Sequence, residues 1–229
     1  MVKIGGIQKF STIDYPGYVV AGVFTIGCNM RCGYCHNPEL VLPERYTDAI
    51  PEEIFFEFLE SRVGKLDGVA ISGGEPTMQE DLVDFIRKIK SMGFMVKLDT
   101  NGTDPDVLEK LFAENLVDFV AMDIKGPLNV YSQIAARPID EKAIIRSIEL
   151  IKKSVPHEFR TTIVRGQLSV EDFEEIGKMV EGADRYALQY FIPGTVINSQ
   201  FLDRESFSEK EMNQARNIMN KYVKECVVH

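Results

Sequence analysis

The stretch "YVVAGVFTIGCNMRCGYCHNP", residues 18–38, decides the fold of this 229-residue chain. Residues 18–26 form a short apolar run rich in β-branched side chains, which predicts a strand. The loop that follows holds three of the four cysteines, Cys28, Cys32 and Cys35. In parallel α/β proteins the reactive side chains lie in loops at the carboxyl ends of the strands. The stretch therefore predicts the first strand of such a protein and part of its active site.

The pattern of a strand followed by a helix recurs five more times. Further strands are expected at residues 67–72, 94–100, 117–124, 158–164 and 185–191. Helices are expected at residues 51–64, 79–93, 104–115, 140–154, 169–182 and 208–225. These units predict an α/β fold with a parallel sheet. Because a closed barrel needs eight units, we expect an open, partial (β/α)6 barrel.

One domain is expected over residues 1–229, because a chain of this length can bury a single core. Its expected parts are an N-terminal segment (1–17), a core barrel (18–191) and a C-terminal loop and helix (192–229). Residues 126–138 form the longest irregular connection, and they are the expected moving or partner-binding loop.

Composition restricts the partners and the compartment. The chain has 26 basic and 35 acidic side chains, a net charge of −9 and no dense basic block, so neither nucleic acid nor an anionic membrane is an expected partner. No segment has the apolar length of a signal peptide or a membrane span, so a cytoplasmic location is expected. In that reducing compartment, clustered thiols are more often metal ligands or redox groups than disulfides. Cys226 stands alone and is expected to have no special task.

Distinctive residues follow every predicted strand. Beyond the cysteine loop they are "SGGEP" (72–76), "DTNG" (99–102), "MDIK" (122–125), Arg160 with Arg165, and Gln189 with Tyr190. Because the carboxyl ends of parallel strands meet at one edge, these groups predict a single active-site rim. No nucleophile and base are recognisable among them, and His157 and His229 are expected to be structural or solvated.

Three thiolates on one short loop would repel one another by about 4 kcal/mol per pair at 4 Å, so a cation is expected there. A zinc ion could take Cys28, Cys32, Cys35 and His36, although the adjacency of Cys35 and His36 makes that geometry difficult. A Cys32–Cys35 redox pair would leave Cys28 unexplained. A [4Fe–4S] cluster held by three cysteines would keep one iron open, and we favour it among these three.

The spacing C-x3-C-x2-C, with Tyr34 before the last cysteine and "GGEP" downstream, closely resembles the radical S-adenosylmethionine enzymes. The six strand–helix units match the partial barrel of that family along essentially the whole chain. "CHNP" (35–38) and "STIDYPG" (11–17) are similar to the activating enzymes of glycyl radical proteins. The likeness is strongest to the activating proteins of anaerobic ribonucleoside-triphosphate reductase, and the pyruvate formate-lyase activators are near relatives.

The resemblance implies that S-adenosylmethionine binds the open iron and is reductively cleaved to a 5′-deoxyadenosyl radical. It implies that the cofactor is contacted by Tyr34, Gly73, Gly74, Glu75, Asp99, Thr100, Lys125, Arg160 and Gln189. Lys125 and Arg160 match positions that meet the cofactor carboxylate, and Phe191 stands where the pyruvate formate-lyase activator has a histidine.

Further implied sites lie around these contacts. Asp99, Thr100 and Asp123 match a hard oxygen site for a monovalent cation, and Asp14 matches a residue that helps to hold the glycine loop of a partner protein. The implied partners are a glycyl radical enzyme and an electron donor such as flavodoxin or ferredoxin. The alternatives are a radical enzyme for a small molecule, similar to the 7-carboxy-7-deazaguanine synthases, and a non-catalytic zinc or iron–sulfur protein.

Overall fold

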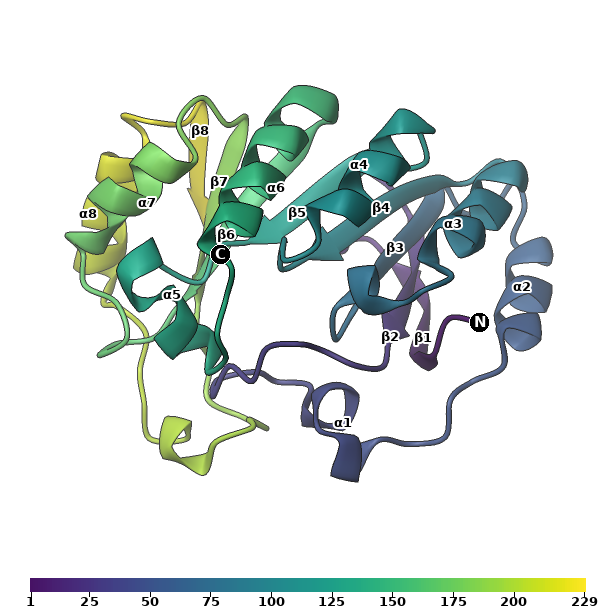
Figure 1. Ribbon diagram of the computed structural model, residues 1–229, viewed down its shortest axis with the longest axis horizontal. Helices are drawn as coiled ribbons and strands as arrows, with labels where there is room; N and C mark the ends of the chain where they lie inside the picture. Colours follow the sequence, from purple (N-terminus) through teal and green to yellow (C-terminus); the bar gives the residue numbers. More distant parts are fainter.

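The computed structural model describes residues 1–229 and gathers eight strands into one sheet, in the order β1 to β8. They are β1 (Ile4–Ser11), β2 (Val20–Thr25), β3 (Gly68–Gly73), β4 (Met95–Thr100), β5 (Phe119–Asp123), β6 (His157–Ile163), β7 (Arg185–Tyr190) and β8 (Glu225–Val228). Strands β2 to β8 run parallel to their neighbours, and β1 is antiparallel to β2. The edge strands β1 and β8 do not pair with each other, so the sheet curves without closing (Figure 1). This confirms the predicted open α/β sheet of the partial-barrel type.

Helices follow most strands and cover the outer face of the sheet (Figure 1). They include α2 (Glu52–Glu60), α3 (Leu82–Ser91), α4 (Pro105–Ala113), α6 (Glu141–Ser154), α7 (Asp172–Met179) and α8 (Glu209–Met219). Local sequence sets their starts. Asp104 accepts a hydrogen bond from the Val107 backbone before α4, and Ser208 and Glu211 form a capping box at α8. No helix combines the length and the apolar character needed to cross a bilayer.

Three features differ from the sequence-based expectations. Strands β1 and β8 extend the sheet at its two edges, so residues 192–229 contain a strand as well as a loop and a helix. The expected irregular connection at 126–138 contains a helix, α5 (Leu128–Ala135), which ends at Ala136 in the left-handed conformation. A four-residue edge strand and a short helix carry little periodicity, and they form here because neighbouring elements pair with or bury them.

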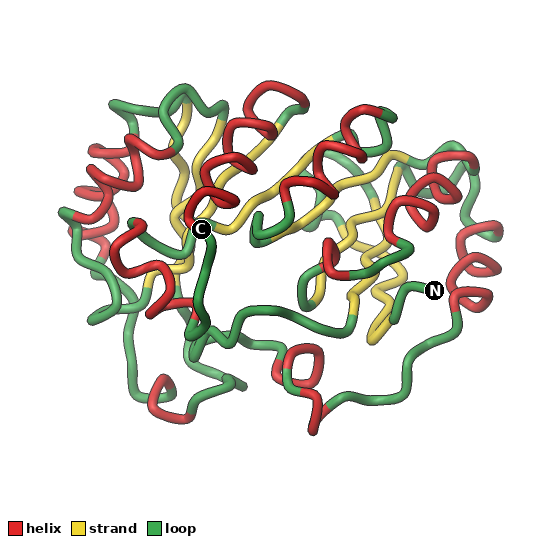
Figure 2. The backbone as a smooth tube through the Cα atoms, viewed as in Figure 1, coloured by secondary structure: helices red, strands yellow, loops and turns green.

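Extended loops leave the carboxyl ends of the strands on one side of the sheet. In Figure 2 the segment between β2 and the short helix α1 (Pro38–Val41) crosses the lower middle of the view, and the segment after β7 descends at the lower left. These loops contain short 3-10 helices at Pro43–Arg45, Pro76–Met78 and Ser199–Phe201. The cysteine loop thus lies where the rim was predicted.

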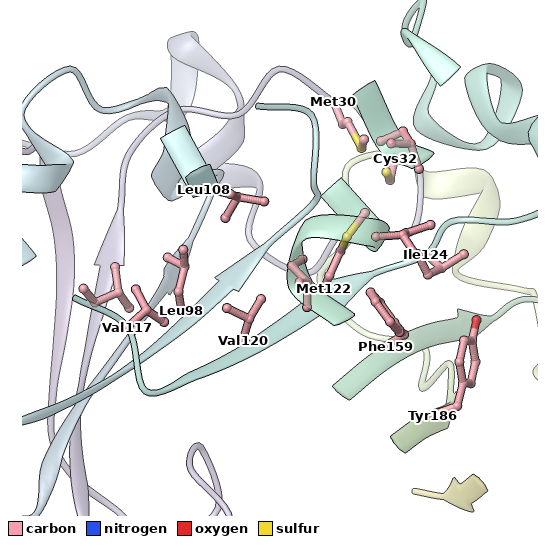
Figure 3. Close-up of a cluster of buried hydrophobic side chains, with 14 of the residues drawn as sticks. Met30, Cys32, Leu98, Leu108, Val117, Val120, Met122, Ile124, Phe159 and Tyr186 are labelled. Carbon is pink, nitrogen blue, oxygen red and sulfur yellow. The ribbon is translucent and has the colours of Figure 1, made fainter. Parts of the chain in front are cut away.

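Alternation along the strands separates a hydrophobic outer face from a mixed inner face. On β4 and β5, Leu98, Val120 and Met122 pack into the cluster between sheet and helices, together with Leu108 of α4 (Figure 3). Cys32 belongs to the same cluster, so the cysteine loop is packed onto the core. The remaining residues of these strands point into the barrel, where they position the site.

The amino end of the barrel interior is filled by a small cluster around Tyr15. This ring is 5% exposed and packs with Val20 and Ala70, against Met95 and Phe119. The cluster keeps the interior closed at the end opposite to the cysteine loop.

Replacing Tyr15 by Ala should lower the free energy of unfolding by about 3–5 kcal/mol, because a buried aromatic ring leaves a cavity. Urea unfolding of the cluster-free protein measures this change. Phe10→Ala is the control, because the Phe10 side chain is 60% exposed, and it should cost far less. Equal losses from both variants would contradict this role for Tyr15.

Candidate functional site

One cavity of about 330 Å³ lies at the carboxyl ends of the parallel strands. It brings together Cys28, Cys32, Tyr34, Cys35, Gly73, Gly74, Glu75, Asp99, Thr100, Asp123, Lys125, Arg160 and Gln189, all of which the sequence had indicated. The cavity is also lined by residues to which the sequence assigned no cofactor contact. His36, Asn37, Ser72 and Asn101 belong to the quoted motifs, whereas Met30, Val41 and Thr162 do not. For the first four, membership in a motif was the available signal.

Backbone contacts from three elements hold the cysteine loop. The carbonyl of Gly27 accepts a hydrogen bond from the Glu75 backbone (2.7 Å), and the Arg31 backbone donates to Ala135 of α5 (2.8 Å). From the segment after β7, the Asn198 backbone donates to Gly33 (3.0 Å), and that of Ile197 donates to Cys35 (3.2 Å). The helix α5, which the sequence did not predict, is therefore one of the supports of this loop.

The three loop thiols form a donor set, and the positive charge of Lys125 only partly offsets the effect of their burial. All are free, and burial raises the pKa of each, to about 12 for Cys28. Such thiols ionise only when a cation binds them. His36 is held by other contacts, because its ring stacks on Phe191 (5.7 Å between centroids) and its Nδ1 lies 3.0 Å from the carbonyl oxygen of Thr195. Three thiols without a histidine ligand fit an iron–sulfur cluster with one open iron better than a zinc site of three cysteines and a histidine.

Gly73 and Gly74 are required by the packing of the "SGGEP" turn. Gly73 has a φ of +114°, and a side chain there would meet the Thr25 backbone nitrogen at 2.3 Å. A side chain at Gly74 would meet the Gly27 carbonyl oxygen at 2.0 Å. These glycines let the turn lie directly against the end of β2 and the cysteine loop. This contact adds a structural reason to the expected role of their backbone in binding a ligand.

Glu75 joins the turn to the "DTNG" motif. Its carboxylate is buried and accepts hydrogen bonds from the Thr77 backbone (3.1 Å), the Thr77 hydroxyl (2.7 Å), the Thr100 hydroxyl (2.7 Å) and the Asn101 backbone (2.6 Å). Burial raises the pKa of Glu75, and these hydrogen bonds oppose the rise. Asn101 continues the connection by donating to the side chain of Asn29 in the cysteine loop (2.8 Å).

Five charged side chains form a chain of ion pairs beside the cavity, and all of them except Lys97 line it. Lys97 contacts Asp99 (2.7 Å), Arg160 contacts Asp99 (3.2 Å) and Asp123 (2.5 Å), and Lys125 contacts Asp123 (2.9 Å). Burial alone would raise the pKa of both carboxyl groups, but Arg160 and the two lysines hold both pKa values below the ordinary range. Lys97 was not indicated by any motif, although a lysine two positions before Asp99 on an apolar strand is a readable signal.

Tyr34 and Gln189 also line the cavity, and each contacts a neighbouring side chain. Tyr34 is 5% exposed, and the Lys125 ammonium lies 6.0 Å from its ring centroid. Gln189 accepts a long hydrogen bond from Thr162 (3.5 Å). Phe191 does not line the cavity and packs against His36 and Tyr34.

Several indicated residues lie outside the cavity. Asp14 is in the loop between β1 and β2, at the amino end of β2, whereas the cysteine loop follows its carboxyl end. Arg165 was placed on the rim, but it pairs with Glu211 at the start of α8 (2.9 Å). Its strand ends at Ile163, one residue earlier than predicted, so Arg165 lies in the loop that follows and outside the cavity.

Two other isolated residues, His157 and Cys226, lie outside the cavity. His157 is buried, with Nδ1 2.8 Å from the carbonyl oxygen of Val155 and Nε2 accepting from the Asp184 backbone (3.2 Å). These contacts fix the ring in a structural position. Cys226 is buried on β8, apart from the three loop cysteines.

Comparison with known proteins supplies the family. A family model described as the radical SAM superfamily matches residues 23–180, which carry the cysteine loop and the rim motifs up to Arg160. The chain belongs to the radical SAM superfamily. It is 38% identical to a protein of Methanocaldococcus jannaschii that is provisionally named a glycyl-radical enzyme activating enzyme. The match covers 98% of this chain and 95% of that protein. This identity and coverage place the protein in that enzyme family.

More distant relatives agree with this placement. The pyruvate formate-lyase-activating enzyme of Listeria monocytogenes is 31% identical over 54% of this chain and 53% of its own length. Among solved structures, SuiB of Streptococcus suis bound to S-adenosylmethionine has a TM-score of 0.68 at 13% identity, covering 89% of this chain and 48% of SuiB. A domain of the pyruvate-formate lyase-activating enzyme from Bacteroides vulgatus has a TM-score of 0.55 at 17% identity, covering 71% and 98% of the two chains. The two structures support the fold, and the family uses a [4Fe–4S] cluster and S-adenosylmethionine.

Replacing Cys28, Cys32 or Cys35 by Ala should each remove the cluster, because two thiolates cannot retain it. Iron and sulfide analysis after anaerobic reconstitution measures the loss. Cys226→Ala is the matched control and should keep the wild-type content. A loop variant with the full iron and sulfide content would refute the ligand assignment.

Replacing Gly74 by Ala should lower the free energy of unfolding by about 1–3 kcal/mol, because the new methyl group would overlap the Gly27 carbonyl. Denaturant unfolding of the cluster-free protein tests this. Gly194→Ala is the control, since a methyl group there would meet nothing closer than 3.9 Å. If Gly74→Ala is as stable as this control, the packing argument is wrong.

Proposed function

We propose that this protein removes a hydrogen atom from one glycine of a partner glycyl radical enzyme, and that the partner is anaerobic ribonucleoside-triphosphate reductase. The observation that carries the activity is a single cavity in which three free thiols face the GGEP, DTNG and MDIK motifs. Membership in the glycyl-radical enzyme activating family supports the class of substrate. The particular partner rests on the "CHNP" and "STIDYPG" motifs.

The cluster and S-adenosylmethionine, when bound, would supply one-electron cleavage of the sulfonium to methionine and a 5′-deoxyadenosyl radical. In the proposed assignment Cys28, Cys32 and Cys35 hold the cluster. Lys125 and Arg160 would bind the carboxylate of the methionine moiety, since both line the cavity and carry positive charge. Tyr34 and Gln189 would lie against the nucleoside, and the backbone of the "SGGEP" turn would meet the amino group.

Abstraction of a hydrogen atom requires that the glycine of the partner protein reaches the cavity. The radical would take a hydrogen atom from the glycine Cα, giving 5′-deoxyadenosine and a glycyl radical on the partner. The electron would come from an external donor of the flavodoxin or ferredoxin class. An open sheet edge supports entry of a polypeptide loop, because β1 and β8 leave the barrel unclosed. Asp14 remains a proposed contact for the partner, at the other end of β2 from the cysteines.

A pyruvate formate-lyase is the second candidate partner, because several activating enzymes of that lyase match about half of this chain. A small-molecule substrate is the remaining radical alternative. The "CHNP" motif and the full-length match to an activating enzyme favour a protein substrate.

Incubation of the reconstituted protein with S-adenosylmethionine, a reductant and anaerobic ribonucleoside-triphosphate reductase should produce a glycyl radical signal in electron spin resonance. Parallel samples contain pyruvate formate-lyase, and the control contains the Cys32→Ala variant, which should give no signal. Release of 5′-deoxyadenosine without a radical on either partner would favour a small-molecule substrate. Failure to cleave S-adenosylmethionine at all would overturn the proposed activity.

A further inference from the structure

Lys97 is the only buried lysine of the chain, and it lies inside the barrel. It is 5% exposed in the middle of β4, paired in register with Ala70 on β3 and Phe119 on β5. A buried ammonium group needs a close anionic partner to offset its desolvation. Its Nζ donates to Asp99 Oδ1 at 2.7 Å, and Lys97 and Asp99 share the inner face of β4 because they are two residues apart.

The oxygen atoms expected to hold a monovalent cation are already engaged by protein groups. Asp99 accepts from Lys97 and pairs with Arg160, while Asp123 pairs with Arg160 through one oxygen and Lys125 through the other. The Thr100 hydroxyl donates to Glu75 and accepts from the Gly102 backbone. A metal ion would have to displace an ammonium or a guanidinium group from each carboxylate. These side chains therefore do not fit an exchangeable cation.

Charge counting shows what Lys97 contributes. Lys97, Arg160 and Lys125 give three positive charges and the two aspartates give two negative charges, so 3 − 2 leaves one positive charge on this chain of ion pairs. Without Lys97 the same group would sum to 2 − 2, which is zero. Arg160, which already contacts both aspartates, would then be the only cation beside Asp99, and less net positive charge would face a bound carboxylate.

We propose that Lys97 is a tethered cation that takes the place of a bound monovalent metal ion at Asp99. It acts as a positioning residue: by neutralising Asp99 it leaves Arg160 and Lys125 available for the carboxylate of the ligand. The proposal rests on the proposed function in taking S-adenosylmethionine as that ligand. It implies that the protein needs neither sodium nor potassium to bind the cofactor.

The test is equilibrium binding of S-adenosylmethionine to the anaerobically reconstituted full chain, in choline, sodium or potassium chloride at equal ionic strength. The wild-type dissociation constant should change by less than about twofold among the salts. Lys97→Met keeps an unbranched side chain that is one atom shorter and removes the charge. This variant should bind S-adenosylmethionine about tenfold more weakly in choline chloride and regain affinity in sodium or potassium chloride. Lys90→Met is the matched control, since Lys90 pairs with Asp118 (2.7 Å) away from the cavity, and it should show neither effect.

Thermal unfolding of the cluster-free protein gives a second readout that needs no cofactor. Sodium or potassium chloride should raise the melting temperature of Lys97→Met above its value in choline chloride. The melting temperatures of the wild type and of Lys90→Met should be the same in all three salts. A wild-type affinity that rises about tenfold with sodium or potassium would overturn the proposal and favour a metal site. An unchanged affinity of Lys97→Met in choline chloride, or a loss that no salt restores, would also overturn it.

The wild-type comparison stands even if Lys97→Met does not fold. If no sample binds S-adenosylmethionine in any salt, the proposed function fails, whereas the cluster-free melting comparison still tests Lys97. The two failures are therefore distinguishable.

Discussion

The geometry of the site depends on the contacts of one buried residue, Glu75. Its backbone nitrogen binds the cysteine loop at Gly27, and its carboxylate binds the end of β4 at Thr100 and Asn101. Three segments distant in the sequence are thereby held at fixed spacing. A buried carboxylate is costly unless its oxygens accept several hydrogen bonds, so these loops must adopt this arrangement together. The cavity is consequently shaped before any ligand binds.

Charge is the second constraint on the cavity. The inner face of the sheet places Lys97, Asp99 and Asp123 among small or apolar neighbours, where unpaired charges would be strongly destabilising. Arg160 reaches from β6 to both aspartates and so connects β4 with β6 across β5. This chain of pairs stiffens the wall that faces the cysteine loop. It also leaves a net positive charge where the proposed activity needs to hold a carboxylate.

The cysteine loop is supported by neighbouring elements as well as by its own packing onto the core. Backbone hydrogen bonds reach it from the "SGGEP" turn, from α5 and from the segment after β7. Loops of this kind are well placed to hold a reactive group, because the rigid sheet orients them while their backbone remains adaptable. In a family that binds a metal cluster, such external support keeps three thiols on one side of the cavity, facing the ion-pair chain.

The sequence by itself determined the strand–helix alternation, because hydrophobic periodicity is a local property. The alternation in turn predicted an open parallel sheet and a rim that collects the motifs, because strands joined by helices run parallel and end at one edge. It also indicated the cysteine triad, Glu75, Lys125 and Arg160 by their spacing after strands. Only the tertiary structure decided the rest. Strands β1 and β8, helix α5 and the position of His36 depend on pairing partners far away in the sequence. The pairing of Lys97 with Asp99, and of Arg160 with both aspartates, was likewise set by three-dimensional proximity, because a buried charge takes whichever opposite charge the fold brings within reach.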